Sequence, residues 1–307
     1  MRNQIEIASE VNNSSSADKL ASVVRENKNN RSNFLKFCAA FFAVGIVLFG
    51  CDKDDGDSGG DKVKLLETTY YDGYLYQKFE YDAQNRITKI YYYNDGEIDE
   101  TYTFTYNSAG DLTSMSYIDT DNSDDNYTTN ITYAGNKITF DDDDSFAMDL
   151  NPDGLLIKVT EEYGDDDLYT WDYVYQNGNL TKATQTDKWW SSPAGGGTYR
   201  TVITASTFTY DDMKSPLNNC NTPKWVLIWQ FEGEIGIKNN PKIRTSKSID
   251  SAENAEFGNV YESTHESTST YTYTYDDEGY PLTCTAKWVD DDGDEHDWNV
   301  TYTYITK

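Results

Sequence analysis

Strict alternation of aromatic and polar residues recurs along residues 65–307 and predicts β-strands. The clearest stretches are 102–106 (Tyr-Thr-Phe-Thr-Tyr), 169–173 (Tyr-Thr-Trp-Asp-Tyr) and 271–275 (Tyr-Thr-Tyr-Thr-Tyr). In each stretch the rings fall on one face and Thr or Asp on the other, which is the period-two pattern of a half-buried strand. Tyr, Thr, Phe and Trp also favour pleated surfaces.

Many of these strands end in a repeated phrase: a Tyr, a turn, an apolar residue and often Thr. Copies lie at residues 79–88, 104–113, 173–181 and 273–283, and weaker copies at 131–139 and 148–156. The turns place Asn85, Gly110, Gly154, Gly178 or Gly279 where a positive φ is needed. An Asp or Asn directly after the Tyr can accept the backbone hydrogen bonds that close such a turn. Recurrence of this kind indicates a repeated β-hairpin.

The connections at the other end of these hairpins are predicted to be longer and acidic. They fall at residues 119–126, 141–144, 165–167 and 290–297. Consecutive hairpins joined by short turns form an all-β, antiparallel up-and-down meander. Two strands per copy predict roughly 10–14 strands, and a sheet of that size is expected to wrap or close into a barrel, which removes its exposed edges.

The predicted barrel is soluble, with the Tyr-rich faces filling a wide interior. A membrane barrel needs an outward apolar band about 25 Å tall. Here the outward faces are expected to carry Thr, Ser, Asp and Lys.

An irregular insertion is predicted at about residues 185–265, where the repeat breaks. Residues 188–197 read as a projecting loop that carries Trp189 and Trp190. Residues 224–231 are very apolar and fit either a buried strand or a short helix. Pro241 and the polar residues 246–256 read as loop.

The N-terminal region contains a candidate targeting signal. Residues 37–49 form an apolar run of about 13 residues, too short for the roughly 20 that a spanning helix needs, and a basic flank precedes it. The run ends in Leu48-Phe49-Gly50-Cys51, which resembles the lipobox of bacterial lipoproteins. The resemblance implies that residues 1–50 are a leader and signal peptide and that Cys51 is lipidated.

Residues 51–64 are predicted to be an acidic, flexible tether ahead of the barrel domain at 65–307. The Lys53-Asp54-Asp55 stretch resembles the export signal of Bacteroidota surface lipoproteins. That resemblance implies an outer-membrane, lipid-anchored protein exposed at the cell surface. A solvated linker facing the periplasm is the alternative.

The phrase Tyr-Asp-x-x-Gly-x-Leu-Thr resembles the YD repeat of the RHS type. Together with the lipobox and the closing stretch 273–281, it resembles a Bacteroidota lipoprotein family of unknown function with a porin-like fold. The resemblance implies a lipid-tethered β-barrel and supplies no activity.

The net charge of the chain limits the kinds of molecule that it can bind. The chain has a formal net charge of −28. Such a charge repels phosphates, so nucleic acid is excluded, and contact with a membrane is expected through the N-terminal lipid alone. An extracellular glycan or protein is compatible with this charge.

No catalytic motif is visible, so we predict a binding or structural protein rather than an enzyme. The chain contains two histidines, His265 and His296, and neither lies in a nucleophile signature. Carboxylate pairs of the kind that glycosidases use are expected by chance in so acidic a chain. A hydrolase remains the less favoured alternative, and it requires a cluster of acids or histidines that only the fold can assemble.

Two acidic stretches are candidate Ca²⁺ ligands, and no other cofactor is predicted. Alternate oxygen ligands, as at the start of an EF-hand loop, are offered by Asp119, Asp121, Ser123 and Asp125, and a second cluster by Asp290, Asp292 and Asp294. The closing Glu of the EF-hand pattern is missing from the first stretch. Solvated turn acids are the alternative interpretation.

Two further residue pairs suggest sites. Trp189 and Trp190 form a candidate stacking platform for glycan or nutrient capture, and capping of a hydrophobic core is the alternative. Cys220 and Cys284 form a candidate disulfide outside the cytoplasm, and two separate thiols are the alternative.

Overall fold

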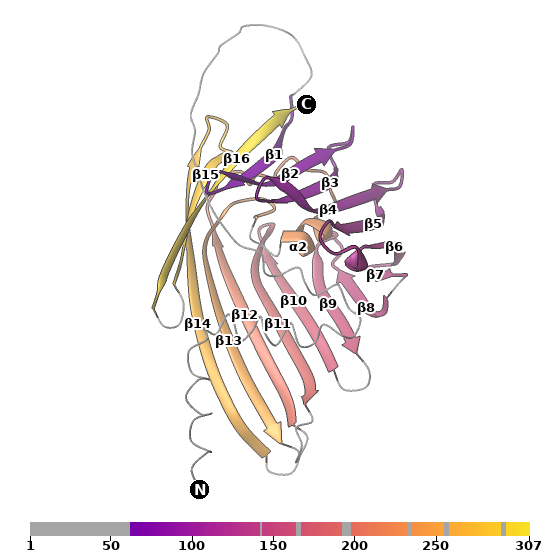
Figure 1. The fold of residues 1–307 in the computed structure, drawn as a ribbon, viewed down its shortest axis with the longest axis vertical. Helices are drawn as coiled ribbons and strands as arrows, with labels where there is room; N and C mark the ends of the chain where they lie inside the picture. Colours follow the sequence, from indigo (N-terminus) through magenta and orange to yellow (C-terminus); the bar gives the residue numbers. More distant parts are fainter. Residues whose placement is uncertain are drawn as a thin grey trace, which may run out of the picture. The chain divides into compact units, whose positions relative to one another are not determined.

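The computed structural model describes residues 62–141, 143–163, 167–191, 198–231, 235–254, 258–289 and 293–307. These residues form sixteen antiparallel strands in one sheet, which closes where β1 (Lys64–Tyr71) pairs with β16 (Glu295–Thr306). The closed up-and-down barrel is therefore confirmed (Figure 1), and it has more strands than the sequence predicted.

The strands that follow β1 are short, mostly of eight residues. They are β2 (Tyr74–Tyr81), β3 (Ile87–Asn94), β4 (Glu97–Tyr106), β5 (Leu112–Asp119), β6 (Tyr127–Ala134), β7 (Lys137–Phe140), β8 (Asp143–Leu150) and β9 (Leu156–Tyr163). Most later strands are longer: β10 (Asp167–Gln176), β11 (Asn179–Ser191), β12 (Thr198–Tyr210), β13 (Pro241–Asn254), β14 (Gly258–Tyr275) and β15 (Pro281–Val289). Figure 1 shows β11 to β14 as a wall that extends beyond the short strands.

The predicted insertion at 185–265 is wrong in its extent. Residues 185–191 and 198–210 belong to β11 and β12, and the predicted loop at 246–256 falls largely within β13. These strands pair in an unbroken register from Thr198↔Asn254 to Thr209↔Ile243. Their Ser- and Thr-rich sequence hides the alternation, because polar residues occupy both faces. The irregular segment is limited to residues 211–240.

The repeated turns lie together at one end of the barrel, here called the turn rim. The side-chain oxygen of Asn107 accepts hydrogen bonds from the backbone N–H groups of Ala109 and Asp111, at 2.9 and 3.0 Å. The same arrangement occurs at Asp82, Asn151 and Asp276. All five predicted positive-φ positions are confirmed, with φ of 61° at Asn85 and 74° at Gly154.

The prediction for the opposite end is partly wrong. Two of its connections, at residues 72–73 and 95–96, are two-residue Asp-Gly turns with both residues at positive φ. This is the type I′ geometry that matches the twist of a hairpin. Residues 120–126 form the longer acidic connection that was expected, with a 3₁₀ turn at Ser123–Asp125.

Residues 211–231 and 235–240 lie between β12 and β13 and carry the helix α2 (Lys224–Phe231). Its rings contact strands on different sides of the lumen: Phe231 lies 6.2 Å from Phe79 of β2, and Trp229 lies 5.8 Å from Phe140 of β7. Trp225, Val226, Leu227, Ile228 and Phe231 are all buried. A helix that is apolar all round fits only such an interior position. The apolar stretch 224–231 is thus a helix that packs inside the lumen against the short strands.

The two faces of the strands differ as predicted. Inward positions carry the core, including Phe104, Met115, Met148 and Val159, each 4% exposed or less. Outward positions such as Thr105, Lys182 and Glu266 are exposed and polar. Exposed large hydrophobic residues are scattered over many strands, with two of them, Tyr199 and Ile203, on β12. Among the described residues no helix is long and apolar enough to cross a membrane.

Candidate functional site

A line of six tyrosines crosses the inner face of β1 to β6. Successive ring centroids are 4.9–5.6 Å apart. In order along the line the residues are Tyr71, Tyr76, Tyr92, Tyr102, Tyr117 and Tyr127. One residue comes from each strand. Tyr102, Tyr117 and Tyr127 are directly paired across β4, β5 and β6, whereas Tyr92 pairs with Glu100 and meets the Tyr102 ring diagonally. We call this set the tyrosine line.

The tyrosine line is partly open. Tyr102 and Tyr117 are buried, at 2% and 6% exposure, whereas Tyr76, Tyr92 and Tyr127 are half-buried. The hydroxyl of Tyr92 accepts a hydrogen bond from the Gln230 amide of α2, at 3.2 Å. The line therefore borders the helix α2, and three of its tyrosines stay partly exposed.

One carboxylate accompanies the tyrosine line. The Tyr102 hydroxyl donates to Glu100, at 3.3 Å. Burial raises the pKa of Glu100 above its usual range, and nearby Asp99 adds to the shift, while the hydrogen bonds from the tyrosines oppose it. The line thus combines aromatic surface with an acceptor for hydroxyl groups.

The long wall, β10 to β14, presents hydrogen-bonding side chains on its inner face. Directly paired positions place Trp171, Gln185, Thr204, Ser248 and His265 in one row across five strands. Thr204 donates to the Ser248 hydroxyl at 3.1 Å, and Ser206 and Ser246 are 2.9 Å apart in the next row. Such a surface offers many donors and acceptors at fixed spacing.

A second row of the long wall places an aromatic residue between two acids. Tyr169 pairs with Glu161 on one side and with Asp187 on the other. The Gln185 amide donates to both carboxylate oxygens of Asp187, at 3.0 and 2.9 Å. Burial raises the pKa of Asp187, and this hydrogen bond partly opposes the shift. Burial, together with Asp167, Asp187 and Glu161, raises the pKa of Tyr169 to about 12.

Beyond this row lies a charged pair stacked on an indole. Arg200 Nε donates to Asp250 Oδ1 at 3.0 Å, and Nη2 bonds Oδ2. The guanidinium carbon lies 5.5 Å from the centre of the Trp189 ring, on the strand position directly opposite. The side chain of Arg200 is 45% exposed, against 16% for Asp250.

The predicted platform of Trp189 and Trp190 is not formed. Both residues lie in β11, not in a loop, and adjacent strand residues point to opposite faces. Trp189 faces inward toward Arg200, whereas Trp190 packs on Tyr199 of the outward face, with ring centroids 4.4 Å apart. Glycan binding by either ring stays a prediction, but the two rings do not share one surface.

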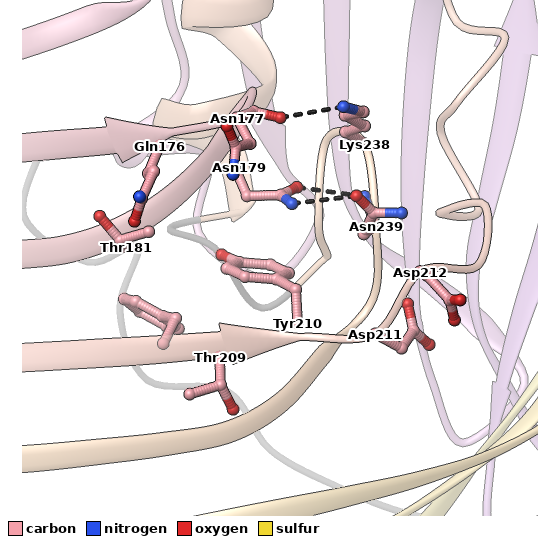
Figure 2. Close-up of a pocket in the computed structure, with 11 residues that line it drawn as sticks. Gln176, Asn177, Asn179, Thr181, Thr209, Tyr210, Asp211, Asp212, Lys238 and Asn239 are labelled. Atoms are coloured by element: carbon pink, nitrogen blue, oxygen red, sulfur yellow. Dashed lines mark hydrogen bonds between the residues drawn. The ribbon is translucent and has the colours of Figure 1, made fainter.

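A pocket of about 510 Å³ lies at the turn rim, where β11 and β12 stop pairing (Figure 2). Its polar groups bond mainly to one another. Asn179 donates to Asn239 at 3.0 Å, and the Asn239 N–H returns a bond at 3.2 Å. Lys238 donates to the Asn177 carbonyl at 3.0 Å. The arrangement ties residues 211–240 to the rim, so we assign this pocket a structural role.

Two of the predicted calcium ligands, Asp119 and Asp125, take part in turn closure. Asp119 accepts bonds from the N–H groups of Asp121 and Asn122, and Asp125 accepts one from the Asn122 amide. Asp294 is exposed, and Asp290 and Asp292 lie outside the described residues. The described ranges contain no group of three or more His, Cys, Asp or Glu side chains that could hold a metal ion. Calcium binding stays a prediction.

The other predicted site residues are placed as follows. Cys220 and Cys284 are free thiols, so the predicted bridge is not formed. Cys284 faces the lumen from β15, and burial raises its pKa to about 12.

His265 lies 3.4 Å from the Ser263 hydroxyl, and His296 stacks on Trp288 at 5.1 Å. Cys51, with the leader and most of the tether, lies outside the described residues.

The tyrosine line and the Arg200–Asp250 pair were not predicted. A signal for the line is present, because nearly every strand between residues 71 and 127 carries an inward Tyr. The sequence does not give the register of each strand against its neighbours, so the contacts between the rings could not be predicted. Arg200 and Asp250 are 50 residues apart, and only the β12–β13 register brings them together.

Comparison with known proteins adds the following. No family model and no curated protein matches this chain. Twelve solved chains match it. One is a porin-like protein from Bacteroides uniformis ATCC 8492, with 19% identity, 80% of this chain and 97% of that chain covered, and a TM-score of 0.31. Another is a porin-like protein from Bacteroides vulgatus ATCC 8482, with 12% identity, 72% and 99% covered, and a TM-score of 0.30. The barrel itself is defined by its strand pairing.

Proposed function

We propose that this protein is a lipid-anchored outer-membrane protein that captures an oligosaccharide in the lumen of its barrel and has no catalytic activity. The observation that carries the proposal is the tyrosine line. An aromatic face has a negative quadrupole, and the C–H groups on one side of a pyranose ring pack against it. A row of rings at a regular spacing suits a chain of sugar units.

The long wall supports the same ligand class. Its inner rows carry amide, hydroxyl and imidazole groups, including Gln185, Thr204, Ser248 and His265. Binding sites for polar ligands combine apolar and aromatic surface with a few fixed polar groups that set orientation. Sugar hydroxyls both donate and accept hydrogen bonds, so they match this mixture.

A glycan array tests the proposal. The full chain carrying Cys51→Ala, which removes the lipidation site, is probed against immobilised oligosaccharides. We expect retention on at least one class of glycan and its loss in Tyr76→Ala, since Tyr76 is half-buried between two rings of the line. Tyr91→Ala is the matched control, because Tyr91 lies on the outward face and bonds Glu80. Absence of retention on every glycan contradicts the proposal.

The anchor is tested separately. The apolar run that ends at Cys51 supports lipidation, and Lys53-Asp54-Asp55 supports display at the cell surface. Mass spectrometry of the protein from bacterial membranes is expected to find an acylated Cys51 as the N-terminal residue. Protease added to intact cells is expected to degrade the protein. An unmodified Cys51 contradicts the anchor, and full protection from protease contradicts surface display.

A further inference from the structure

We propose that Trp189, Arg200 and Asp250 form a subsite for one neutral sugar unit, and that their pairing excludes acidic sugars. The inference rests on the proposed function, because it names the chemical class of the captured oligosaccharide. Its position is the inner face of the long wall, on β11, β12 and β13.

The shape of the subsite follows from the register. Trp189, Arg200, Ala252 and Tyr261 occupy directly paired positions on β11, β12, β13 and β14. Adjacent strands are about 4.8 Å apart, so the two rings stand about 14 Å apart across the row. Arg200 and the small Ala252 lie between them. The row thus has an aromatic residue at each end, with a guanidinium group and a small side chain between them.

The hydrogen-bonding capacity of the pair suits hydroxyl groups. A guanidinium has five N–H donors, and the contacts with Asp250 use one on Nε and one on Nη2. Each carboxylate oxygen has a second lone pair for a further donor. Neighbouring hydroxyls of a sugar can therefore bond to Arg200 and Asp250 together while the pair stays intact. The Trp189 ring beneath the guanidinium keeps its plane fixed.

Charge argues against an acidic ligand. Arg200 is already neutralised by Asp250, and Asp187 lies on the adjacent strand one row away. A ligand carboxylate must displace Asp250 to reach Arg200. That displacement leaves Asp250, whose side chain is only 16% exposed, without its partner. Breaking a partly buried ion pair in this way is costly because the stranded charge is poorly solvated.

Calorimetric titration of the full chain carrying Cys51→Ala tests the inference. The probes are neutral hexasaccharides of glucose, mannose, galactose and xylose, and the acidic probe is hexagalacturonate. We expect binding of at least one neutral probe and no measurable binding of the acidic probe. Arg200→Lys keeps the charge but loses the bidentate geometry, so we expect affinity for the neutral probe to fall about tenfold. Lys188→Ala, next to Trp189 on the outward face, is the matched control and is expected to bind as the parent does.

A gain of binding gives a readout that misfolding cannot produce. Asp250→Asn releases the Arg200 charge, so this variant is expected to bind hexagalacturonate when the parent does not. If the parent binds a neutral probe and Arg200→Lys binds equally well, the subsite is refuted while the proposed function stands. Stronger binding of hexagalacturonate than of the neutral probes by the parent also refutes it. If the parent binds no oligosaccharide of either kind, the proposed function itself fails.

Discussion

The Tyr106 hydroxyl donates a hydrogen bond to the backbone carbonyl of Ile87, 2.7 Å away on the neighbouring strand. The β3–β4 ladder ends at Lys89↔Thr103, so it stops two residues short of Ile87 on β3. The tyrosine thus supplies a donor where the two strands have separated. The same relationship joins Tyr81 to Leu66, Tyr133 to Leu112, Tyr175 to Leu156, Tyr210 to Leu180 and Tyr304 to Pro281.

This relationship explains the spacing of the repeated phrase. The Tyr of one phrase bonds to the apolar residue of the preceding phrase, as Tyr106 bonds to Ile87. It thereby joins the first and last residues of one hairpin. At most rim turns a bulge, such as that between Thr105 and Tyr106, disrupts the ladder next to the Tyr. The tyrosine hydroxyl supplies a donor to a carbonyl of the strand on the other side.

Tyr106→Phe is expected to lower the free energy of unfolding by about 1–2 kcal/mol, because the Ile87 carbonyl loses its donor. Urea denaturation followed by fluorescence measures the change. Tyr91→Phe is the control: its hydroxyl bonds Glu80 on the outward face, at 3.2 Å, and its loss is expected to cost under about 0.5 kcal/mol. Equal stability of the two variants would show that the rim hydroxyls are not structural.

Gly154→Ala is expected to cost about 1 kcal/mol, because φ at Gly154 is 74° and no heavy atom lies within 4 Å of an added Cβ. The penalty is therefore one of backbone conformation alone. Asn85 occupies the equivalent position of the first copy at a φ of 61°. Gly154→Asn should consequently be tolerated better than Gly154→Ala in thermal unfolding, and the reverse order would refute the assigned turn geometry.

The sequence predicts an element of the fold well where residues close in sequence determine its conformation. The hairpins and the residues of the turns at Asn107 and Asp276 were predictable, because each turn is closed by its own side chain. The strand β13 and the part of β14 before residue 271 were not, since Ser246, Ser248 and Ser267 face a wide lumen and leave no apolar alternation to detect.

The helix α2 and the candidate site needed information from distant parts of the chain. The apolar stretch 224–231 has no polar face, so its period was undetectable before the barrel that encloses it was known. Trp189 and Trp190 looked like a pair because they are adjacent in sequence, and the strand geometry separates them.

Ile228→Ala is expected to lower the free energy of unfolding by about 2–4 kcal/mol, because the side chain is 2% exposed inside the lumen and its loss leaves a cavity. Gln230→Ala on the same helix removes one hydrogen bond, to Tyr92, and is expected to cost about 1 kcal/mol. Denaturant titration of both variants separates these outcomes. Similar small losses would indicate that Ile228 is not packed against the inner face of the barrel.

The stability of the barrel is expected to fall in acid through its turn carboxylates. Burial alone would raise the pKa of Asp276, but the hydrogen bond from Lys64, at 2.5 Å, and those from the turn amides outweigh it and hold the pKa below its usual range. Asp82 is held low in the same way, by Arg86. An acid with a lowered folded-state pKa stabilises the fold above its unfolded-state pKa of about 3.9, and that contribution is lost as the pH falls through the folded value.

Denaturation of Asp276→Asn between pH 7 and pH 3 checks this expectation. The variant is expected to be less stable than the parent at pH 7, and the difference is expected to shrink as the pH approaches 3. A difference that stays constant over this range would show that the charge of Asp276 contributes nothing.

Asp187 is expected to behave in the opposite way. Burial raises its pKa, so ionisation is less favourable in the folded state than in the unfolded chain. The resulting penalty is present at neutral pH and disappears as the pH falls below the unfolded-state value. Asp187→Asn keeps a carbonyl acceptor for Gln185 and is therefore expected to raise the thermal midpoint at pH 7 but not at pH 3. A lower midpoint at pH 7 would contradict this.

Saturation-transfer difference NMR tests the central claim, that the tyrosine line binds sugar rings, most directly. Saturation of the aromatic protons of the full chain carrying Cys51→Ala is expected to transfer to the ring C–H protons of a retained oligosaccharide, and more strongly to one face of each sugar. The transfer should be lost in Tyr76→Ala and kept in Tyr91→Ala. Equal transfer in parent and Tyr76→Ala, or transfer spread evenly over both faces of the sugar, would contradict the account.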